Sequence, residues 1–174
     1  MPVPRTFKVF TCGTSAQPLI GTTLSSAITA HPETAQTIPV ADSSMFVNSD
    51  TVLIVPASGG VPVYEYPVQI QVVSATQIRA VFTKPHNSGD FVILSFPCAN
   101  VPVQCVKSSP PTSSIFLGNT ANLTTSGAGA FYDVGLSLYF QPPASGWTNA
   151  DNTSNYWIIA ASGTQSYLPA AWTN

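Results

Sequence analysis

The sequence predicts an all-β protein, in which a small antiparallel β-barrel is followed by a small β-sandwich and preceded by an extended N-terminal arm. The first observation is the low charge: 7% of the 174 residues are charged, against about 25% in an average soluble domain. Surface helices usually carry Lys, Glu and Arg on the face toward water, so this composition argues against them. The second observation is a series of short apolar runs separated by Gly, Pro, Asn and Ser, which is typical of strands and turns.

The first 37 residues are expected to form one strand and an extended arm. Residues 5–11 alternate weakly between apolar and polar side chains, which fits a strand. Residues 12–37 are mostly small and polar, and prolines such as Pro18 and Pro32 interrupt them. We expect this arm to reach across neighbouring subunits of an assembly.

Residues 38–106 are predicted to form the barrel. Strands are expected at 52–55, 68–72, 77–82 and 91–96. The second and third of these alternate with a period of two, as half-buried strands do. Consecutive short strands joined by turns imply an antiparallel barrel or a small sandwich.

Residues 107–113, Lys-Ser-Ser-Pro-Pro-Thr-Ser, are the predicted linker, because paired prolines beside serines resist both helices and central strands. Residues 114–174 are predicted to form the sandwich. Its strands are expected at 114–118, 120–125, 136–141, 156–161 and 164–168.

The balance of charges bears on partners and location. A net charge of −2 without any basic run leaves little field to attract nucleic acid, so no nucleic-acid partner is expected. No apolar run approaches the roughly 20 residues of a membrane span, and no secretory signal is visible. We therefore expect a protein made in a cytoplasm that does not enter a membrane. The low charge also indicates a surface that an assembly covers, with a compact neutral monomer as the alternative.

The three cysteines, Cys12, Cys98 and Cys105, form no Cys-x-x-Cys pair. Free buried thiols are favoured in a reducing cytoplasm, and a bridge between Cys98 and Cys105 is the alternative. Neither His31 nor His86 lies at a ligand spacing from a cysteine, which argues against a zinc site. No metal or cofactor is therefore expected.

His86, four residues before Asp90 and close to Lys84, is the candidate catalytic residue. An enzyme would use it as a general base oriented by Asp90. The alternative, which we favour, is that His86 hydrogen-bonds the loop backbone and closes the barrel. No nucleophile elbow, carboxylate pair in a suitable context or His-Glu-x-x-His motif is present. The sequence therefore predicts a protein that is not an enzyme.

Aromatic residues near the C-terminus are the candidates for binding. On a β-sandwich such residues pack in the core, anchor a protein interface or stack on sugars. Alternation places Tyr156 and Ile158 on one face of a strand, with Trp157 and Ile159 on the other. The candidate interface or glycan contacts are Trp147, Tyr156, Trp157 and Trp172.

Four segments of the C-terminal region resemble a small β-sandwich module of tailed-phage structural proteins. They are Ile115-Phe116-Leu117-Gly118-Asn119, Thr124-Thr125-Ser126-Gly127, Leu136-Ser137-Leu138 and Tyr156-Trp157-Ile158-Ile159-Ala160-Ala161-Ser162-Gly163-Thr164. In that module the first segment starts the sandwich and the last forms a closing hairpin. The central segment departs from it, since Asp133-Val134-Gly135 stands where Pro-Gly is common.

A second resemblance covers Phe46–Ile54, Val68–Val73 and Ile78–Gly89. These residues are similar to a β-barrel unit that also recurs in phage virion proteins and contains a Gly-Asp turn and a His-x-x-Gly segment. Ser49 stands where that unit usually has Gly, which puts the geometry of this turn in question.

Together the two resemblances imply a virion structural protein made in the host cytoplasm, of the capsid decoration (cement) or head-fibre type, that binds and stabilises the assembled phage head. The implied partners are the major capsid protein and further copies of the chain, as a trimer on local threefold axes. The alternative is a tail or fibre component that binds host-surface glycan.

Overall fold

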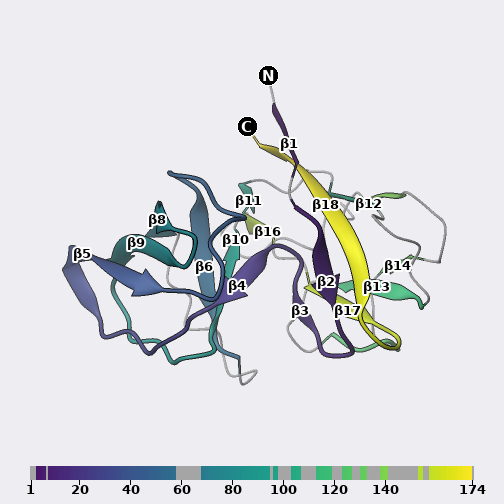
Figure 1. The fold of residues 1–174 in the computed structure, drawn as a ribbon, viewed down its shortest axis with the longest axis horizontal. Coiled ribbons are helices and arrows are strands. Elements are labelled where there is room, and N and C mark those ends of the chain that lie inside the picture. The colour runs from purple at the N-terminus through teal and green to yellow at the C-terminus, as the bar shows by residue number, and fades with distance from the viewer. Residues whose placement is uncertain are drawn as a thin grey trace. The chain divides into compact units, whose positions relative to one another are not determined.

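The computed structural model describes residues 3–6, 8–57, 68–94, 96–97, 103–106, 113–118, 123–126, 130–132, 138–140, 153–154 and 157–173. Within these residues every regular element is a β-strand, and every pairing between strands is antiparallel (Figure 1). The predicted all-β fold class is therefore confirmed.

The chain forms two compact units. The inserted unit consists of Ile20–Ser95, and the flanking unit consists of Met1–Leu19 together with Phe96–Asn174. This division differs from the predicted one, which placed boundaries after residue 37 and at the linker 107–113. The reason is that N-terminal strands pair with strands near the C-terminus, and a pairing across that distance leaves no local signal in the sequence.

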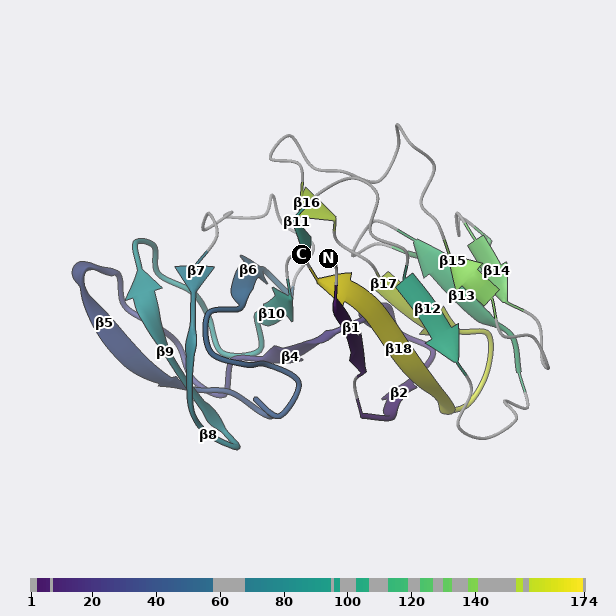
Figure 2. The same cartoon turned by 90° about the horizontal axis from the view of Figure 1, so that it is seen from above.

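The inserted unit contains two sheets. Its strands are β4 (Gly21–Thr23), β5 (His31–Pro39), β6 (Thr51–Val55), β7 (Val68–Gln69), β8 (Gln71–Ser74), β9 (Gln77–Phe82) and β10 (Phe91–Leu94). One sheet has the order β4-β10-β6-β7 and the other β5-β9-β8. Figure 2 shows β9 between β5 and β8. Residues 31–39, most of which belong to the predicted arm, are thus an edge strand of this unit.

Backbone hydrogen bonds join the two sheets at two corners. At the first, Ile70 separates β7 from β8, its N–H donates to the Asp50 carbonyl (2.9 Å), and its carbonyl accepts the Ser49 N–H (2.8 Å). At the second, the N–H of Ala41 donates to the carbonyl of Thr23 (2.9 Å) beside the Leu24–Val40 bridge. Neither sheet of the described residues closes on itself, but these corners make the arrangement barrel-like.

The core of the inserted unit follows the predicted alternation. In β9 the residues Ile78, Ala80 and Phe82 are buried, while Gln77 and the others of that parity are exposed. Burying an aliphatic or aromatic side chain of this size contributes about 1.5–3 kcal/mol. The largest fully buried side chains of the unit are Ile20, Leu24, Val40, Leu53, Ile54, Ile70, Ile78, Phe82 and Ile93.

Two turns of the inserted unit have the same construction, and each leads directly into a central strand. In Val47–Asp50 the Asp50 N–H donates to the Val47 carbonyl (3.1 Å) and a carboxylate oxygen accepts the Val47 N–H (2.8 Å). In Asn87–Asp90 the corresponding distances are 3.2 Å and 2.9 Å. The third residue has a positive φ in both: 72° at Ser49 and 88° at Gly89. A type II turn requires this conformation and favours Gly there, so Ser49 keeps the geometry that Gly would adopt.

The flanking unit contains the remaining strands. They are β1 (Val3–Thr6), β2 (Phe10–Cys12), β3 (Gln17–Pro18), β11 (Phe96–Pro97), β12 (Val103–Val106), β13 (Ile115–Gly118), β14 (Ala130–Tyr132), β15 (Leu138–Phe140), β16 (Thr153–Ser154), β17 (Trp157–Ala160) and β18 (Gln165–Thr173). One sheet has the order β1-β18-β12-β15, with β2 also pairing with β18, and a second has the order β14-β13-β17-β3. The strands β11 and β16 pair in a third, two-stranded sheet. In Figure 1, β1 and β2 follow one edge of β18.

Several expectations for this region need correction. The closing segment is not a paired hairpin, because β17 and β18 belong to different sheets and the turn at Gly163 (φ 61°) passes between them. Residues 123–126 are not a strand: they are an irregular segment that ends in a turn. The linker residues 107–112 lie outside the described residues.

The core of the flanking unit surrounds β17 and the start of β18. All four residues of β17, Trp157–Ala160, are buried, so both faces of this strand are covered. The ring of Phe10 stacks on the ring of Tyr167 with a centroid distance of 5.7 Å. The buried hydroxyl of Tyr167 donates to the carbonyl of Leu19 (2.8 Å), which holds the last residue before the inserted unit to β18.

We predict opposite effects from exchanging the third residues of the two similar turns. Ser49→Gly should raise the free energy of unfolding by about 0.5–1 kcal/mol, because the strain of a positive φ exceeds the added entropy of the unfolded chain. Gly89→Ser should lower it by a similar amount, since a Cβ built there meets no atom within 4 Å and the cost is conformational. Urea denaturation measures both. Destabilisation by Ser49→Gly would contradict the assignment of this turn.

We also predict that residues 20–95 fold without the rest of the chain. Their ends lie side by side, because the N–H of Leu94 donates to the carbonyl of Ile20 (3.0 Å), and their core is their own. A fragment of residues 96–174 should not fold, since it lacks the β1, β2 and β3 partners of β18 and β17. Circular dichroism and dispersion of amide NMR signals distinguish folded from unfolded fragments. A folded 96–174 fragment would count against the paired arrangement.

Candidate functional site

The described residues do not bring the aromatic candidates together on an exposed binding surface. Trp157 lies in β17 and is 3% exposed, so it is a core residue to which a ligand has no access in this chain. Trp172 lies in β18, where its backbone pairs with Pro4 of β1. Trp147 and Tyr156 lie outside the described residues. The predicted glycan contacts therefore do not form a described site.

His86 and Asp90 hold a loop in place through hydrogen bonds that involve backbone groups. His86 is 4% exposed, its N–H donates to the carbonyl of Ile28 (3.0 Å), and its carbonyl accepts the N–H of Ile28 (2.8 Å). Its imidazole packs edge-on against the ring of Phe82, with 6.5 Å between the centroids. The bond between His86 and the loop backbone that the favoured interpretation expects is therefore present, whereas the described strands do not close a barrel.

The Asp90 carboxylate is committed to backbone donors. One oxygen accepts the N–H of Ala57 (3.2 Å) and the other accepts the N–H of Asn87 (2.9 Å). Asp90 is 5% exposed, and a buried carboxylate requires such partners because burial without them is costly. These contacts give Asp90 a structural role in positioning the strand β10.

Among the described residues, no group of three or more His, Cys, Asp and Glu residues is placed to hold a metal ion. They also include no helix long and apolar enough to cross a membrane.

The free thiol of Cys12 belongs to the core, and Cys12 lies in β2 opposite Gln165 of β18. It is 1% exposed, and burial raises its pKa from 9.0 to about 12. A thiol reacts as the thiolate, so this cysteine is protected both sterically and electrostatically. Cys98 lies outside the described residues, so the favoured free thiols at Cys98 and Cys105, and the alternative bridge between them, stay predictions.

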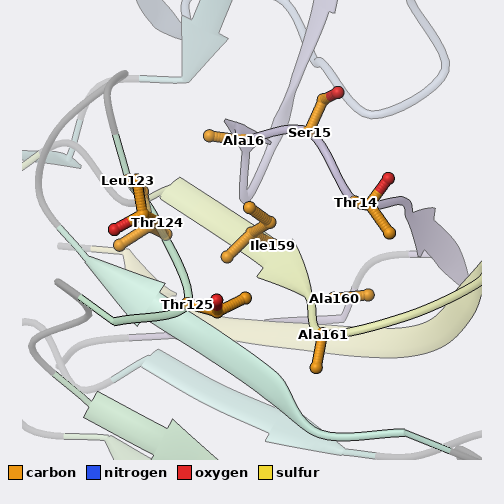
Figure 3. A pocket seen from close by; sticks show the side chains of 9 residues that line it. All are labelled: Thr14, Ser15, Ala16, Leu123, Thr124, Thr125, Ile159, Ala160 and Ala161. Atoms are coloured by element: carbon orange, nitrogen blue, oxygen red, sulfur yellow. The ribbon is translucent and has the colours of Figure 1, made fainter.

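The candidate site is a hollow of about 690 Å³ on the flanking unit, which lies within the size range of ligand pockets. Figure 3 shows nine side chains around it, and Ile159 lies between its two walls. Thr14, Ser15 and Ala16 form one wall, Leu123, Thr124 and Thr125 form the other, and Ile159, Ala160 and Ala161 form the floor. The hollow is therefore a wide trough over the end of β17.

Hydrogen bonds and burial hold the walls of this trough in place. The Gly13 carbonyl, next to the first wall, accepts the N–H of Ala160 (2.8 Å). The N–H of Ala161 donates to the carbonyl of Ser114 (2.8 Å), which fixes the floor to the start of β13. Leu123 is 4% exposed and anchors the opposite wall in the core. The trough is thus formed before any ligand arrives.

The chemistry of the lining is neutral. Four residues carry hydroxyls and five are aliphatic, and none of the nine is charged or aromatic. The hydroxyls of Thr124 and Ser126 lie 3.3 Å apart and bond to each other. Within the described part of the chain the hydroxyls of Thr14, Ser15 and Thr125 have no hydrogen-bond partner, so they can bond to a ligand. Among these nine residues no general base stands beside a hydroxyl.

Comparisons of this chain with family models, with curated proteins and with solved structures find no match. The interpretation of the trough therefore rests on its own residues. The sequence indicated part of the lining of the trough, because Thr124-Thr125-Ser126 and Ala160-Ala161 belong to the first resemblance. Thr14–Ala16 fell in the predicted arm, and nothing local indicates that this turn packs beside β17.

We predict that Cys12 does not react while the protein is folded. In a Cys98→Ala/Cys105→Ala variant, Ellman's reagent near neutral pH should modify Cys12 only after urea is added. The folded thiol keeps its proton where the unfolded thiol has lost it, so stability should be full below about pH 9 and fall as the pH rises toward about 12.

Urea denaturation across this pH range measures the effect, and the matched Cys12→Ala variant should lack this part of the pH dependence. Rapid modification of the folded protein would contradict the burial of Cys12.

Proposed function

We propose that the protein is a non-enzymatic virion structural protein of the capsid decoration type, which binds the assembled phage head and stabilises it. The observation that carries the proposal is the position of the segments that resemble phage modules. Ile115–Gly118 and Trp157–Ala160, from the first and last of these segments, are directly paired strands, with Ile115 opposite Ala160 and Gly118 opposite Trp157. They form the centre of one sheet, as parts of a single module would.

The second resemblance also corresponds to one structural unit. Its segments supply β6, β8 and β9 and both of the turns that end in Asp. Its Gly positions have a physical reason, because Gly89 has a φ of 88° and Ser49, where Gly is usual, has a φ of 72°. The two turns of like construction lead into β6 and β10, which supports a structural role for this unit.

Weakly charged β surfaces on the inserted unit are available for docking. Val47, Val73 and Val81 are 53%, 50% and 39% exposed. The N–H of Val72 donates to the side-chain carbonyl of Asn48 (2.8 Å), so Val47 and Val73 flank the same contact. Burying such residues against a partner would contribute the apolar part of an interface.

The mechanism proposed is thermodynamic linkage. A protein that binds the assembled shell and not its free subunits stabilises the shell by mass action, by about 2.7 kcal/mol per site at 100 times the Kd. A trimer on local threefold axes of the shell would place copies symmetrically. The arm expected to reach across neighbours has no such role here, because β3, β4 and β5 place residues from 17–39 in sheets. Docking would therefore use sheet faces and turns.

Glycan binding by a tail or fibre component receives less support from the described residues. Trp157 is buried, and none of the nine described residues that line the trough is aromatic.

The proposal is tested by the copy number of the protein in purified virions and by the stability of the heads. Quantitative mass spectrometry should find on the order of hundreds of copies, as repeated binding to a symmetric shell requires. Heads purified without the protein should release their genome at a lower temperature, and adding the protein should restore the higher temperature. Val73→Glu should weaken this restoration, while Val9→Glu on the flanking unit serves as the matched control.

Absence from virions would overturn the proposal. A copy number of about three to twelve would favour a tail or portal component.

A further inference from the structure

The inserted unit contains two similar halves, residues 22–54 and residues 68–94. Each half has a strand that crosses from one sheet to the other, a strand of the sheet β5-β9-β8, a turn that ends in Asp, and a strand of the second sheet. These elements follow the same order in both halves. The strand β5 of the first half pairs with β9 of the second, and β6 of the first half pairs with β10 of the second. Equivalent strands are therefore neighbours in both sheets.

One shift of 40 positions in the sequence relates the paired strands in both sheets. Ile38 lies opposite Ile78 in one sheet, and Leu53 lies opposite Ile93 in the other. The two sheets pair their strands independently of each other. A shift common to both indicates one twofold axis that passes through the centre of each pairing.

The contacts between β5 and β9 are reciprocal under this shift. Thr37 lies opposite Arg79, and Pro39 lies opposite Gln77. These two contacts are copies of each other, one on either side of the central pair. An interface in which one surface binds a second copy of itself has this property.

The two turns that end in Asp are equivalent under the same shift. It relates Val47–Asp50 to Asn87–Asp90, in which the carboxylate accepts the N–H of the first residue at 2.8 Å and 2.9 Å. It also relates Ser49, with a φ of 72°, to Gly89, with a φ of 88°. The backbone of the two halves therefore agrees even where the side chains differ.

Each turn is bonded to the crossing strand of the other half. At the first turn, the N–H of Ile70 donates to the carbonyl of the Asp (2.9 Å), and its carbonyl accepts the N–H of Ser49 (2.8 Å). At the second turn, the N–H of Leu24 donates to the carbonyl of the Asp (2.8 Å), and its carbonyl accepts the N–H of Gly89 (2.8 Å). Neither half can make these bonds without the other.

Beyond the crossing, each strand pairs within its own half. The N–H of Ser25 donates to the carbonyl of Pro39 (3.0 Å), and Gln71 lies opposite Arg79. Between these partners the first half has 13 residues and the second has 7. The halves thus differ in the length of one connection while the pairings on both sides of it agree.

We propose that the inserted unit is an internal duplication, in which each half has a self-complementary interface and recognises a second copy of the same half. The halves bind each other as the subunits of a symmetric dimer do. The residues at the axis belong to the core, since Ile38, Leu53, Ile78 and Ile93 are each at most 4% exposed. An interface of this kind resembles a domain core cut in half, as obligate dimers have.

The first experiment exchanges equivalent segments within the full chain. Residues 49–54 receive the sequence of residues 89–94, Gly-Asp-Phe-Val-Ile-Leu, and residues 89–94 receive Ser-Asp-Thr-Val-Leu-Ile, so the composition does not change. We expect one cooperative urea transition, followed by the amide NMR signals of the inserted unit. The physical reason is that every exchanged side chain enters an equivalent environment.

The matched control makes the same exchange displaced by one residue. Residues 49–54 receive the sequence of residues 88–93, and residues 89–94 receive that of residues 48–53. This places each Asp one position beyond the turn that it closes, and it places Thr at the fully buried position of Val92. We expect the control to lose the cooperative transition.

Two further variants of the full chain test the complete half. In one, the sequence of residues 22–54 replaces residues 68–94, and in the other the sequence of residues 68–94 replaces residues 22–54. A self-complementary half should form a folded unit with its own copy, so we expect at least one of these variants to show the amide dispersion of a folded protein.

Two results would overturn the inference. The first is that neither the exchange variant nor either variant with a repeated half unfolds cooperatively. The second is that the displaced control folds as well as the exchange variant does. The inference uses only the pairings within the inserted unit, so its failure would leave the proposed function standing.

Discussion

The fold depends on the pairing of β4 with β10, at the point where the chain enters and leaves the inserted unit. Val92 lies opposite Thr22 in this pairing, and the N–H of Leu94 closes it by donating to the carbonyl of Ile20. It brings residues far apart in the sequence together, so that the flanking unit can be built from both ends of the chain. Closing such a long loop costs conformational entropy, which the buried core of the inserted unit offsets. Without this pairing, β2 and β3 could not return to β18 and β17.

A chain with few charges uses its carboxylates inside turns. Asp42 accepts the N–H of Ser44 (2.8 Å), Asp50 that of Val47, and Asp90 those of Ala57 and Asn87. Hydrogen bonds to ionised acceptors are stronger than neutral ones, so each carboxylate stabilises the turn that aims the following strand. These three acidic groups consequently support the fold, while Lys8, Glu33, Arg79 and Lys84 are exposed among the described residues.

The sequence predicted those strands whose burial pattern is set by residues close together in the chain. The period of two over 77–82 predicted β9 with its buried face. The turn at Ser49, whose geometry the second resemblance left in question, has a positive φ of 72° at that residue. Pairing between strands that are distant in the sequence could not be predicted from such patterns. Gln17 and Pro18 belong to the predicted arm, but in the structure they lie opposite Ile158 and Trp157. Trp157 illustrates the same limit, because alternation predicts one covered face, whereas packing on both sides of β17 buries every residue of the strand.

The trough could not be predicted for the same reason, since its walls come from turns that become neighbours only when β3 joins β17. Its neutral lining has a consequence for recognition. Electrostatic steering accelerates association when charges face each other, and a site without charges gains none of this acceleration. Its affinity would have to come from shape, hydrogen bonds and buried methyl groups, which salt screens little. A contact of that kind is weak alone and is strengthened when copies are joined in one oligomer, because the first bound copy raises the effective concentration of the copies linked to it.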